Sequence, residues 1–211
     1  TDFPCTLTED GESSSSGVAM ACLACMHCSR VHCSRLNPSF NQMHLEWLCW
    51  LVIRQTTSCS VVVNRTTTVG AAQVVFSDYN HEVIELATIP NTQRNATTDK
   101  ATFYSGDWHL MSEHMAQANH GTDVEFDLIL SAETIYTESV SVELFKTIRR
   151  HLKRRGGVAL VAAKSYYFGT GGSVHHFKSL VSQDATMVAH TVWESNDARS
   201  NVREILQLAF V

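Results

Sequence analysis

Short apolar runs alternate with polar turns along the last two thirds of the chain. Runs of apolar and β-branched residues predict strands over residues 73–77, 102–104, 126–131 and 158–163. Apolar residues at helical spacing predict helices over residues 81–87, 138–150 and 174–181, and Pro90 predicts the end of the first of these. Residues 187–193 and 202–210 are rich in β-forming residues and flank a turn-forming segment, which predicts a closing antiparallel hairpin.

This alternation of strands and helices is typical of the α/β class. Successive βαβ units give a mainly parallel sheet covered by helices on both faces. We therefore predict a Rossmann-like sheet, mostly parallel, to which the terminal hairpin adds a reversed strand. Ligands of such sheets bind beyond the carboxyl ends of the strands. The loops that follow the predicted strands are thus the places to look for binding residues.

The first part of the chain does not share this pattern. All seven cysteines precede residue 60, residues 1–69 contain no lysine, and no glycine lies between Gly17 and Gly70. We therefore separate an atypical, Cys-rich and Ser-containing segment, residues 1–69, from a domain formed by residues 70–211. Within the first segment, residues 10–17 predict a flexible stretch, residues 44–53 fit either a helix or a strand, and residues 61–63 predict extended backbone.

The early cysteines suggest a zinc site. The residue types that bind zinc gather at Cys22, Cys25, His27, Cys28, His32 and Cys33. Structural zinc sites normally close with a second ligand pair farther along the chain, and this cluster has none. Incidental thiols are the favoured interpretation, and we expect no metal. A small Cys/His metal-binding protein is the alternative from a different functional class.

Composition and charge narrow the function classes. The 211 residues are 44% hydrophobic, and the net charge of −5 argues against a general nucleic-acid or anionic-membrane binder. The longest apolar run, residues 47–53, is far shorter than the ~20 residues that span a bilayer. No secretory leader is evident. A basic cluster, Arg149, Arg150, Lys153, Arg154 and Arg155, fits a solvated helix terminus better than a surface that guides an RNA-rich substrate.

Three predicted strands are followed by loops that combine an acidic with an aromatic residue. These loops are Asp78-Tyr79-Asn80, Gly106-Asp107-Trp108 and the segment AETIY at 132–136. A carboxylate can accept hydrogen bonds from both hydroxyls of a ribose, and an aromatic ring can flank a base. For each loop alone, a capping aspartate beside a core aromatic is the favoured explanation. Their occurrence at successive strand ends favours a nucleotide-like ligand.

The segments around these loops carry a resemblance to a known family. They read VFSDYN (75–80), IPN (89–91), FYSGDW (103–108), FDLILSAETIY (126–136) and AKSYYFGTGG (163–172), followed by Phe177. Together they resemble the histidine protein methyltransferases, which are seven-stranded enzymes dependent on S-adenosylmethionine. The run YYFGTGG is the most specific part of the match. The resemblance extends over about residues 70–211.

The resemblance implies an activity and its partners. It implies S-adenosylmethionine as cofactor and methylation of a ring nitrogen of histidine in a protein, with a large-subunit ribosomal protein as the expected substrate. It further implies an enzyme of the cytoplasm and nucleus that contacts neither nucleic acid nor membrane directly, and we expect a monomer. A methyltransferase-like module without activity, which binds a protein partner, is the alternative.

The resemblance also assigns roles to individual residues. Asp78 would hold the cofactor ribose, with Tyr79 near the adenine, Asp107 and Trp108 bordering the adenine pocket, and Asn80 and Ser131 completing the cofactor site. Glu133 and Tyr136 match an acidic-x-x-aromatic motif that faces the target nitrogen, so they are the predicted catalytic residues. The predicted substrate entrance consists of Lys164, Tyr166, Tyr167, Phe168, Gly169, Gly171 and Gly172.

One family feature is missing. The resemblance implies a glycine-rich loop after the first strand, where a backbone without Cβ atoms can approach the methionine part of the cofactor. Counting back from Asp78 places that loop near residues 51–62, where the sequence LVIRQTTSCSVV contains neither glycine nor an acidic residue. We therefore predict that the first-strand region is degenerate, that the domain is incomplete on its N-terminal side, and that residues 1–69 are not family sequence. Weak or no cofactor binding is the expected consequence.

Overall fold

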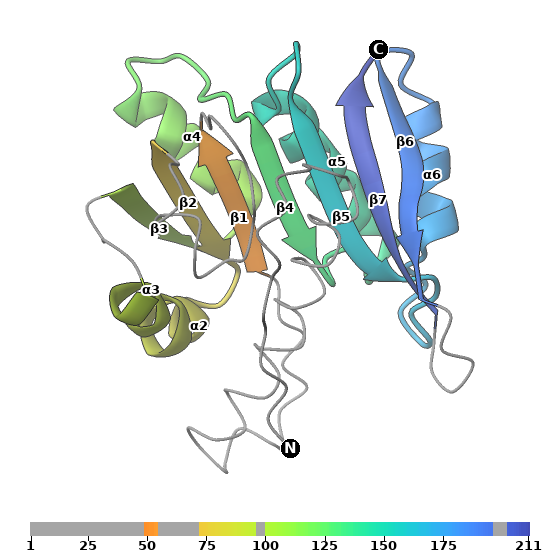
Figure 1. Ribbon diagram of the computed structural model, residues 1–211, viewed down its shortest axis with the longest axis horizontal. Helices are drawn as coiled ribbons and strands as arrows, with labels where there is room; N and C mark the ends of the chain where they lie inside the picture. Colours follow the sequence, from red (N-terminus) through yellow and green to blue (C-terminus); the bar gives the residue numbers. More distant parts are fainter. Residues whose placement is uncertain (1–48, 55–71, 96–99, 196–201) are drawn as a thin grey trace, which may run out of the picture.

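The strands of the protein form one mixed sheet. A computed structural model describes residues 49–54, 72–95, 100–195 and 202–211 (Figure 1). The order in the seven-stranded sheet is β3-β2-β1-β4-β5-β7-β6. In chain order the strands are β1 (Cys49–Arg54), β2 (Gln73–Asp78), β3 (Ala101–Ser105), β4 (Leu128–Ala132), β5 (Val158–Lys164), β6 (Met187–Glu194) and β7 (Arg203–Phe210). Each strand predicted after residue 70 is confirmed, with ends that shift by one or two residues.

Five of the strands share one direction, and β1 and β7 are reversed. β2 pairs with β3 and β4 pairs with β5 in parallel, whereas β7 is antiparallel to both β5 and β6. β1 is antiparallel to its neighbours β2 and β4. The predicted α/β class is therefore confirmed, as a Rossmann-like sheet with five strands in one direction and a terminal antiparallel hairpin. Because β1 is reversed, only two of the six neighbouring pairs, β2–β3 and β4–β5, are parallel.

The reversal of β1 sets the path of the chain through the centre of the sheet. Cys49 pairs with Ala132, the last residue of β4, and Arg54 pairs with Gln73, the first residue of β2. In Figure 1 the arrow of β1 points opposite to the arrow of β4. The chain thus enters β1 where β4 ends and leaves β1 where β2 begins. The helix-or-strand ambiguity of residues 44–53 is settled as strand for residues 49–53.

The helices are α2 (His81–Val83), the π-helix η2 (Ile84–Thr88), α3 (Ile89–Asn95), α4 (Trp108–Ala118), α5 (Glu138–His151) and α6 (Val174–Ser182). α5 and α6 confirm the helices predicted over 138–150 and 174–181. Each begins with a hydroxyl cap, because Thr137 accepts from the Val140 N–H and Ser173 accepts from the His176 N–H. Among the described residues, no helix has the length and apolar character needed to cross a membrane.

The prediction that Pro90 ends the first helix is wrong. Helical structure continues from α2 through η2 and α3 to Asn95. The Ile89 N–H donates to the Ile84 carbonyl in the wider π pattern, so Pro90 falls in the first turn of a new helical segment. Proline is tolerated there because its missing N–H would have no partner in any case.

Helix α4 was not predicted from the sequence. Asp107 caps it, because its Oδ1 accepts a hydrogen bond of 2.7 Å from the His109 N–H. The buried residues of α4 are only Met111, Ser112 and Met115. So sparse an apolar face gives little helical periodicity for a sequence argument to detect.

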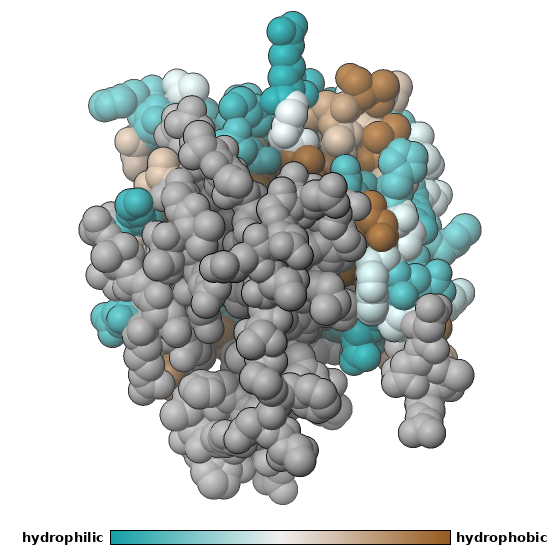
Figure 2. Space-filling view, in the orientation of Figure 1, coloured by the Kyte–Doolittle hydropathy of each residue, from teal (hydrophilic) through white to brown (hydrophobic). Residues whose placement is uncertain are grey.

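Two apolar clusters lie on opposite faces of the sheet. The larger cluster joins side chains of α4, α5 and α6, which lie behind the sheet in Figure 1, to inward residues of the strands such as Ile129 and Val161. The second cluster uses alternate strand positions, including Val74, Phe76 and Leu130. On the face seen in Figure 2, hydrophobic and hydrophilic residues intermix over β6 and β7. The predictions for residues 10–17, for residues 61–63 and for the Cys/His cluster lie outside the described residues.

His151, at the end of α5, is a fully buried ionisable residue in this core. Its Nδ1–H donates to the Val124 carbonyl at 2.7 Å, and its Nε2 accepts from the Ser112 hydroxyl at 2.8 Å. These bonds suit the neutral imidazole, because one ring nitrogen donates and the other accepts. Burial lowers the pKa of His151 below the ordinary value near 6.5.

The buried His151 predicts a loss of stability in acid. Between the lowered folded pKa and the ordinary value near 6.5, the unfolded chain binds a proton that the folded chain does not, so stability falls as pH decreases through this range. We expect the free energy of unfolding, measured in urea at pH 7.5 and 5.5, to decrease less for His151→Gln than for the parent protein. The matched control is His175→Gln, at an exposed position of α6, which should keep the parent's acid sensitivity. Equal acid sensitivity of the parent and His151→Gln would contradict this prediction.

Candidate functional site

The candidate site lies at the edge of the sheet where β2, β3, β4 and β5 end. Because these strands share one direction, their last residues, Asp78, Ser105, Ala132 and Lys164, lie at the same edge. The loops that follow contain the residues singled out in the sequence. The first two loops are joined directly, since the Gly106 N–H donates to the Asp78 carbonyl at 3.0 Å.

Asp78 carries an unused buried acceptor. Its side chain is only 2% exposed, and its Oδ1 accepts from the Asn80 N–H at 2.8 Å. Its Oδ2, like the neighbouring Ser77 Oγ, has no hydrogen-bond partner among the described residues. Burial raises the pKa of the Asp78 carboxyl from about 3.8 to about 7, against the smaller lowering effect of the Asn80 hydrogen bonds. A buried carboxylate oxygen without a hydrogen-bond partner is unusual, and a hydroxyl donor placed beside it would supply the missing hydrogen bond.

The other predicted cofactor residues have mixed surroundings. Tyr79 is 63% exposed, and Asn80 forms the N-cap position of α2. Asp107 is exposed and caps α4, so the capping explanation weighed for this loop holds as well. Trp108 is half-buried against the larger core cluster. The predicted residue Ser131 is buried, and its hydroxyl shares a hydrogen bond of 2.5 Å with the Thr134 hydroxyl.

Glu133 is held in a strained conformation between two cations. Its φ of 56° lies in the left-handed region, which costs a residue with a Cβ atom about 1–2 kcal/mol. Its N–H donates to the Ala162 carbonyl at 2.8 Å. Its carboxylate oxygens lie 3.4 Å from Lys164 Nζ and 3.8 Å from Arg203 Nε. Strained backbone of this kind is concentrated at functional sites, so the geometry supports Glu133 as a candidate.

Arg203 is a site residue that the sequence argument missed. It begins β7, and the antiparallel register places it opposite Lys164. The sequence did predict the strand that contains Arg203, because residues 202–210 form the last strand of the predicted hairpin. The sequence does not show which strand this last strand pairs with. In the structure it pairs with β5, which brings Arg203 opposite Lys164.

The loop from Lys164 to Gly172 folds back on itself beside Tyr136. The Tyr167 N–H donates to the Gly172 carbonyl at 3.0 Å, and the Gly172 N–H donates to the Tyr136 carbonyl at 3.1 Å. A Cβ atom at Gly172 would lie 2.1 Å from the Ile135 carbonyl oxygen, so only glycine fits this approach. The loop is thereby fastened to the segment that carries Glu133 and Tyr136.

The aromatic residues of this loop divide between core and surface. Tyr167 is buried, and its hydroxyl accepts from the Lys164 N–H at 3.2 Å. Tyr166 and Phe168 are 61% and 87% exposed, with ring centroids 6.5 Å apart. Gly169 and Gly171 adopt positive φ angles of 83° and 84° at the tip of the loop. Exposed aromatic rings on a fastened loop suit contact with a macromolecular surface.

Comparison with known proteins identifies the family to which the chain belongs. The family described as "Methyltransferase domain" matches residues 58–209. The chain belongs to the methyltransferase domain family. Its curated relatives include the histidine protein methyltransferase 1 homologues of Dictyostelium discoideum, 35% identical over 136 residues, and of Bos taurus, 32% identical over 138 residues. Histidine protein methyltransferase 1 of Schizosaccharomyces pombe is 30% identical over 138 residues.

These matches are partial on both sides. They cover 64%, 54% and 50% of this chain, and 42%, 36% and 40% of the respective relatives. The chain therefore spans about two fifths of the length of these relatives. The resemblance to histidine protein methyltransferases found in the sequence motifs is confirmed at this level.

The methyltransferase domain implies S-adenosylmethionine, and the residues at the edge fit one end of that molecule. Asp78 Oδ2 is a buried acceptor without a partner among the described residues, and an acceptor is the chemistry that ribose hydroxyls would need. The end of the cofactor that carries the amino acid would require a loop from the carboxyl end of the central strand, but that end of β1 lies at the opposite edge beside Gln73. Among the residues that the structure describes, this edge thus offers an acceptor without a partner, Asp78 Oδ2, and β1 contributes only Cys49 there.

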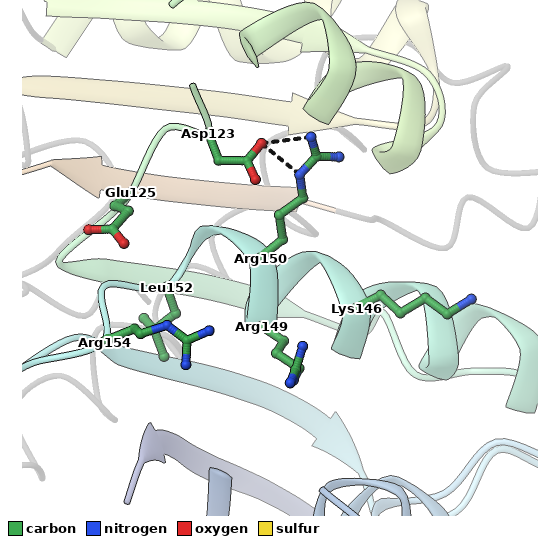
Figure 3. A pocket seen from close by; sticks show the side chains of 7 residues that line it. All are labelled: Asp123, Glu125, Lys146, Arg149, Arg150, Leu152 and Arg154. Carbon is green, nitrogen blue, oxygen red and sulfur yellow. Dashed lines mark hydrogen bonds and ion pairs between the residues drawn. The ribbon is translucent and has the colours of Figure 1, made fainter. Parts of the chain in front are cut away.

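A separate hollow lies at the opposite edge, near the end of α5 (Figure 3). It is lined by Asp123, Glu125, Lys146, Arg149, Arg150, Leu152 and Arg154. Much of its positive charge is paired, because Arg149 contacts Asp184, Arg150 contacts Asp123 at 2.6 Å, and Lys146 contacts Glu143 at 2.8 Å. These pairs agree with the interpretation of the basic cluster as a solvated helix terminus.

The unsatisfied Asp78 predicts a gain of stability on neutralisation. The pKa of Asp78 is about 7 in the folded chain, and the ordinary value is 3.8. The free energy of unfolding therefore decreases as pH rises from 3.8 to about 7, because the unfolded carboxyl ionises first, and the loss stays constant above pH 7. We expect Asp78→Asn to raise the free energy of unfolding by about 1–3 kcal/mol at pH 8, and by less at pH 5. Asp107→Asn, at an exposed cap, should give little change. An Asp78→Asn protein less stable than the parent at pH 8 would refute the assignment.

The close approach at Gly172 predicts a large cost for a single methyl group. Gly172→Ala should destabilise the protein by about 3 kcal/mol, because the clash is with backbone. Gly169→Ala is the matched control: it adds strain at a positive φ but meets no atom within 4 Å, so about 1 kcal/mol is expected. Urea unfolding of both variants compares the two costs, and equal losses would show that the fastening at Gly172 is not tight.

Proposed function

We propose that the protein transfers a methyl group from S-adenosylmethionine to a ring nitrogen of histidine in a protein substrate. The observation that carries this proposal is the placement of two carboxylates at one edge: Asp78, buried with one oxygen that lacks a hydrogen-bond partner among the described residues, and Glu133, held between two cations. The relatives, whose names are those of histidine protein methyltransferases, support a protein histidine as the acceptor. They do not favour an inactive protein-binding module.

The family resemblance also suggests the substrate, the oligomeric state and the location of the enzyme. The substrate is a large-subunit ribosomal protein, the enzyme is a monomer of the cytoplasm and nucleus, and it contacts neither nucleic acid nor membrane directly. The exposed pair Tyr166 and Phe168, beside Lys164 and the glycines of the loop, offers a surface for the protein substrate.

The residues at the edge divide into a cofactor group and an acceptor group. Asp78 would accept hydrogen bonds from the ribose hydroxyls, and the residues that would surround the same end of the cofactor are Tyr79, Asn80, Asp107, Trp108 and Ser131. When bound, S-adenosylmethionine supplies the methyl group and carries it on a positively charged sulfur. The chain's own contribution to catalysis is then to orient the acceptor histidine.

Glu133 is suited to orient that histidine. The attacking ring nitrogen needs a free lone pair, so the imidazole must be neutral and its other nitrogen carries the proton. The Glu133 carboxylate accepts a hydrogen bond from this N–H, which fixes the tautomer and stabilises the positive charge that develops on the ring. Lys164 and Arg203 hold the carboxylate in place, and half-buried Tyr136 packs beside the ring and excludes water.

Replacement of Glu133 by glutamine tests this role. Glu133→Gln keeps the shape and one acceptor oxygen but removes the charge, so kcat should fall by about ten- to a thousandfold with cofactor affinity nearly unchanged. Methyl transfer to histidine is measured by mass spectrometry of a histidine-containing large-subunit ribosomal protein, alongside the melting temperature. Glu143→Gln, which removes a surface carboxylate paired with Lys146, is the control.

Two results would count against the proposal. Normal turnover by Glu133→Gln with a lowered melting temperature would make Glu133 a structural residue. Transfer of the methyl group to a residue other than histidine, or no transfer by the parent protein, would overturn the proposed acceptor.

A further inference from the structure

Two cations face each other where β5 and β7 meet. The antiparallel register places Lys164, the last residue of β5, directly opposite Arg203, the first residue of β7. Like charges at directly opposite positions of neighbouring strands destabilise a sheet. A pair that served stability alone would carry opposite charges, so these two positions point to another role.

Glu133 lies between the two cations and contacts each through a different oxygen. Its Oε2 lies 3.4 Å from Lys164 Nζ, and its Oε1 lies 3.8 Å from Arg203 Nε. All three side chains are partly exposed, and ion pairs of this kind contribute little to the free energy of unfolding. A carboxylate has about four lone-pair sites, so two contacts leave acceptor positions for a further N–H donor.

The two cations differ in their other contacts. The Lys164 N–H donates to the Tyr167 hydroxyl at 3.2 Å, and Lys164 Nζ lies 5.2 Å from the centroid of the Tyr167 ring. Lys164 therefore also belongs to the loop that ends at Gly172. Arg203 comes from the terminal hairpin, on a strand that no part of this loop contains. A change at Arg203 thus tests the hold on Glu133 without a direct change in the loop.

The hairpin fixes the place of Arg203. Its N–H donates to the Ser195 hydroxyl at 2.9 Å, and its carbonyl accepts from the Ser195 N–H at 2.8 Å. The next residue, Glu204, accepts from the Ser165 hydroxyl at 2.8 Å and from the Thr191 hydroxyl at 2.9 Å. These bonds join the start of β7 to β6 and to the residue after β5. The backbone that carries Arg203 is therefore held on both sides.

We infer that Arg203 is a positioning residue for methyl transfer: it holds Oε1 of Glu133 so that the carboxylate presents its remaining acceptor positions to the N–H of the acceptor histidine. This inference rests on the proposed function, which gives Glu133 its role. The terminal torsion of a glutamate is broad, so a contact at one oxygen alone leaves the carboxylate free to turn. Contacts at both oxygens restrict that rotation. Arg203 acts through Glu133 and needs no contact with the substrate.

Substitution of Arg203 in two backgrounds tests this role. We expect Arg203→Gln in the parent chain to lower kcat by about three- to tenfold, with the KM for the protein substrate changed by less than about twofold. In the Glu133→Gln protein, the same substitution should change kcat by less than about twofold, because the charge that Arg203 holds is already absent. Methyl transfer is measured by mass spectrometry of a histidine-containing large-subunit ribosomal protein.

Two further variants separate positioning from folding. Arg203→Lys keeps the positive charge beside Glu133 and should keep kcat within about twofold of the parent value. Arg154→Gln removes an exposed cation at the opposite edge and should leave kcat unchanged. The melting temperature is recorded for every variant. A loss of folded protein would lower kcat by the same factor in both backgrounds, so the comparison does not depend on equal stability.

The outcomes distinguish this inference from the proposed function. Equal factors for Arg203→Gln in the two backgrounds, or an unchanged kcat in the parent chain, would overturn the inference and leave the proposed function intact. A higher KM with unchanged kcat would also overturn it, because Arg203 would then contact the substrate directly. Normal turnover by Glu133→Gln would remove the role of Glu133, and no transfer by the parent chain would remove the proposed activity. Either result would overturn this inference as well.

Discussion

The parallel hydrogen-bond ladders between β2 and β3 and between β4 and β5, joined by β1, which pairs with both β2 and β4, align four strand ends. The rest of the site follows from that alignment. Because the side chains after those ends belong to separate parts of the sequence, no local interaction could gather them. The ladders are stabilised in turn by apolar side chains on both faces of the sheet, such as Val75 and Ile129 toward the helices and Phe76 and Leu130 on the other side. The apolar core thus fixes the positions of Asp78 and Glu133, although its own residues are not part of the candidate site.

Both carboxylate residues are held in energetically unfavourable arrangements. Asp78 is buried with one carboxylate oxygen that has no hydrogen-bond partner among the described residues. Glu133 has a left-handed backbone conformation that favours glycine. The surrounding hydrogen bonds, from Asn80 and Gly106 at one loop and to Ala162 at the other, hold the residues there. Both features lower the stability of the folded chain locally, and the packing of the sheet offsets that loss.

The sequence predicted the features that depend on local pattern. Runs such as residues 158–163 and the helical spacing in residues 138–150 identify their elements because burial imposes the period. Arg203 was missed because its approach to Glu133 spans 70 positions of sequence, from 133 to 203, and depends on the register of β7. The direction of β1 could not be predicted either, since a short apolar strand has the same pattern read forward or backward. The roles of the individual site residues stay predictions.

The reversal of β1 also changes how the sheet can assemble. Parallel neighbours need a crossover that carries the chain back across the sheet, whereas consecutive antiparallel strands can be joined at a single edge. The pairing of β1 with β2 joins residues 19 to 27 positions apart, whereas the pairing of β1 with β4 on its other side joins residues 75 to 83 positions apart. Since loop closure is cheaper for near contacts, the β1–β2 pair costs less chain entropy to close than the β1–β4 pair, so the two neighbours of the central strand differ in how much of the chain each must bring together.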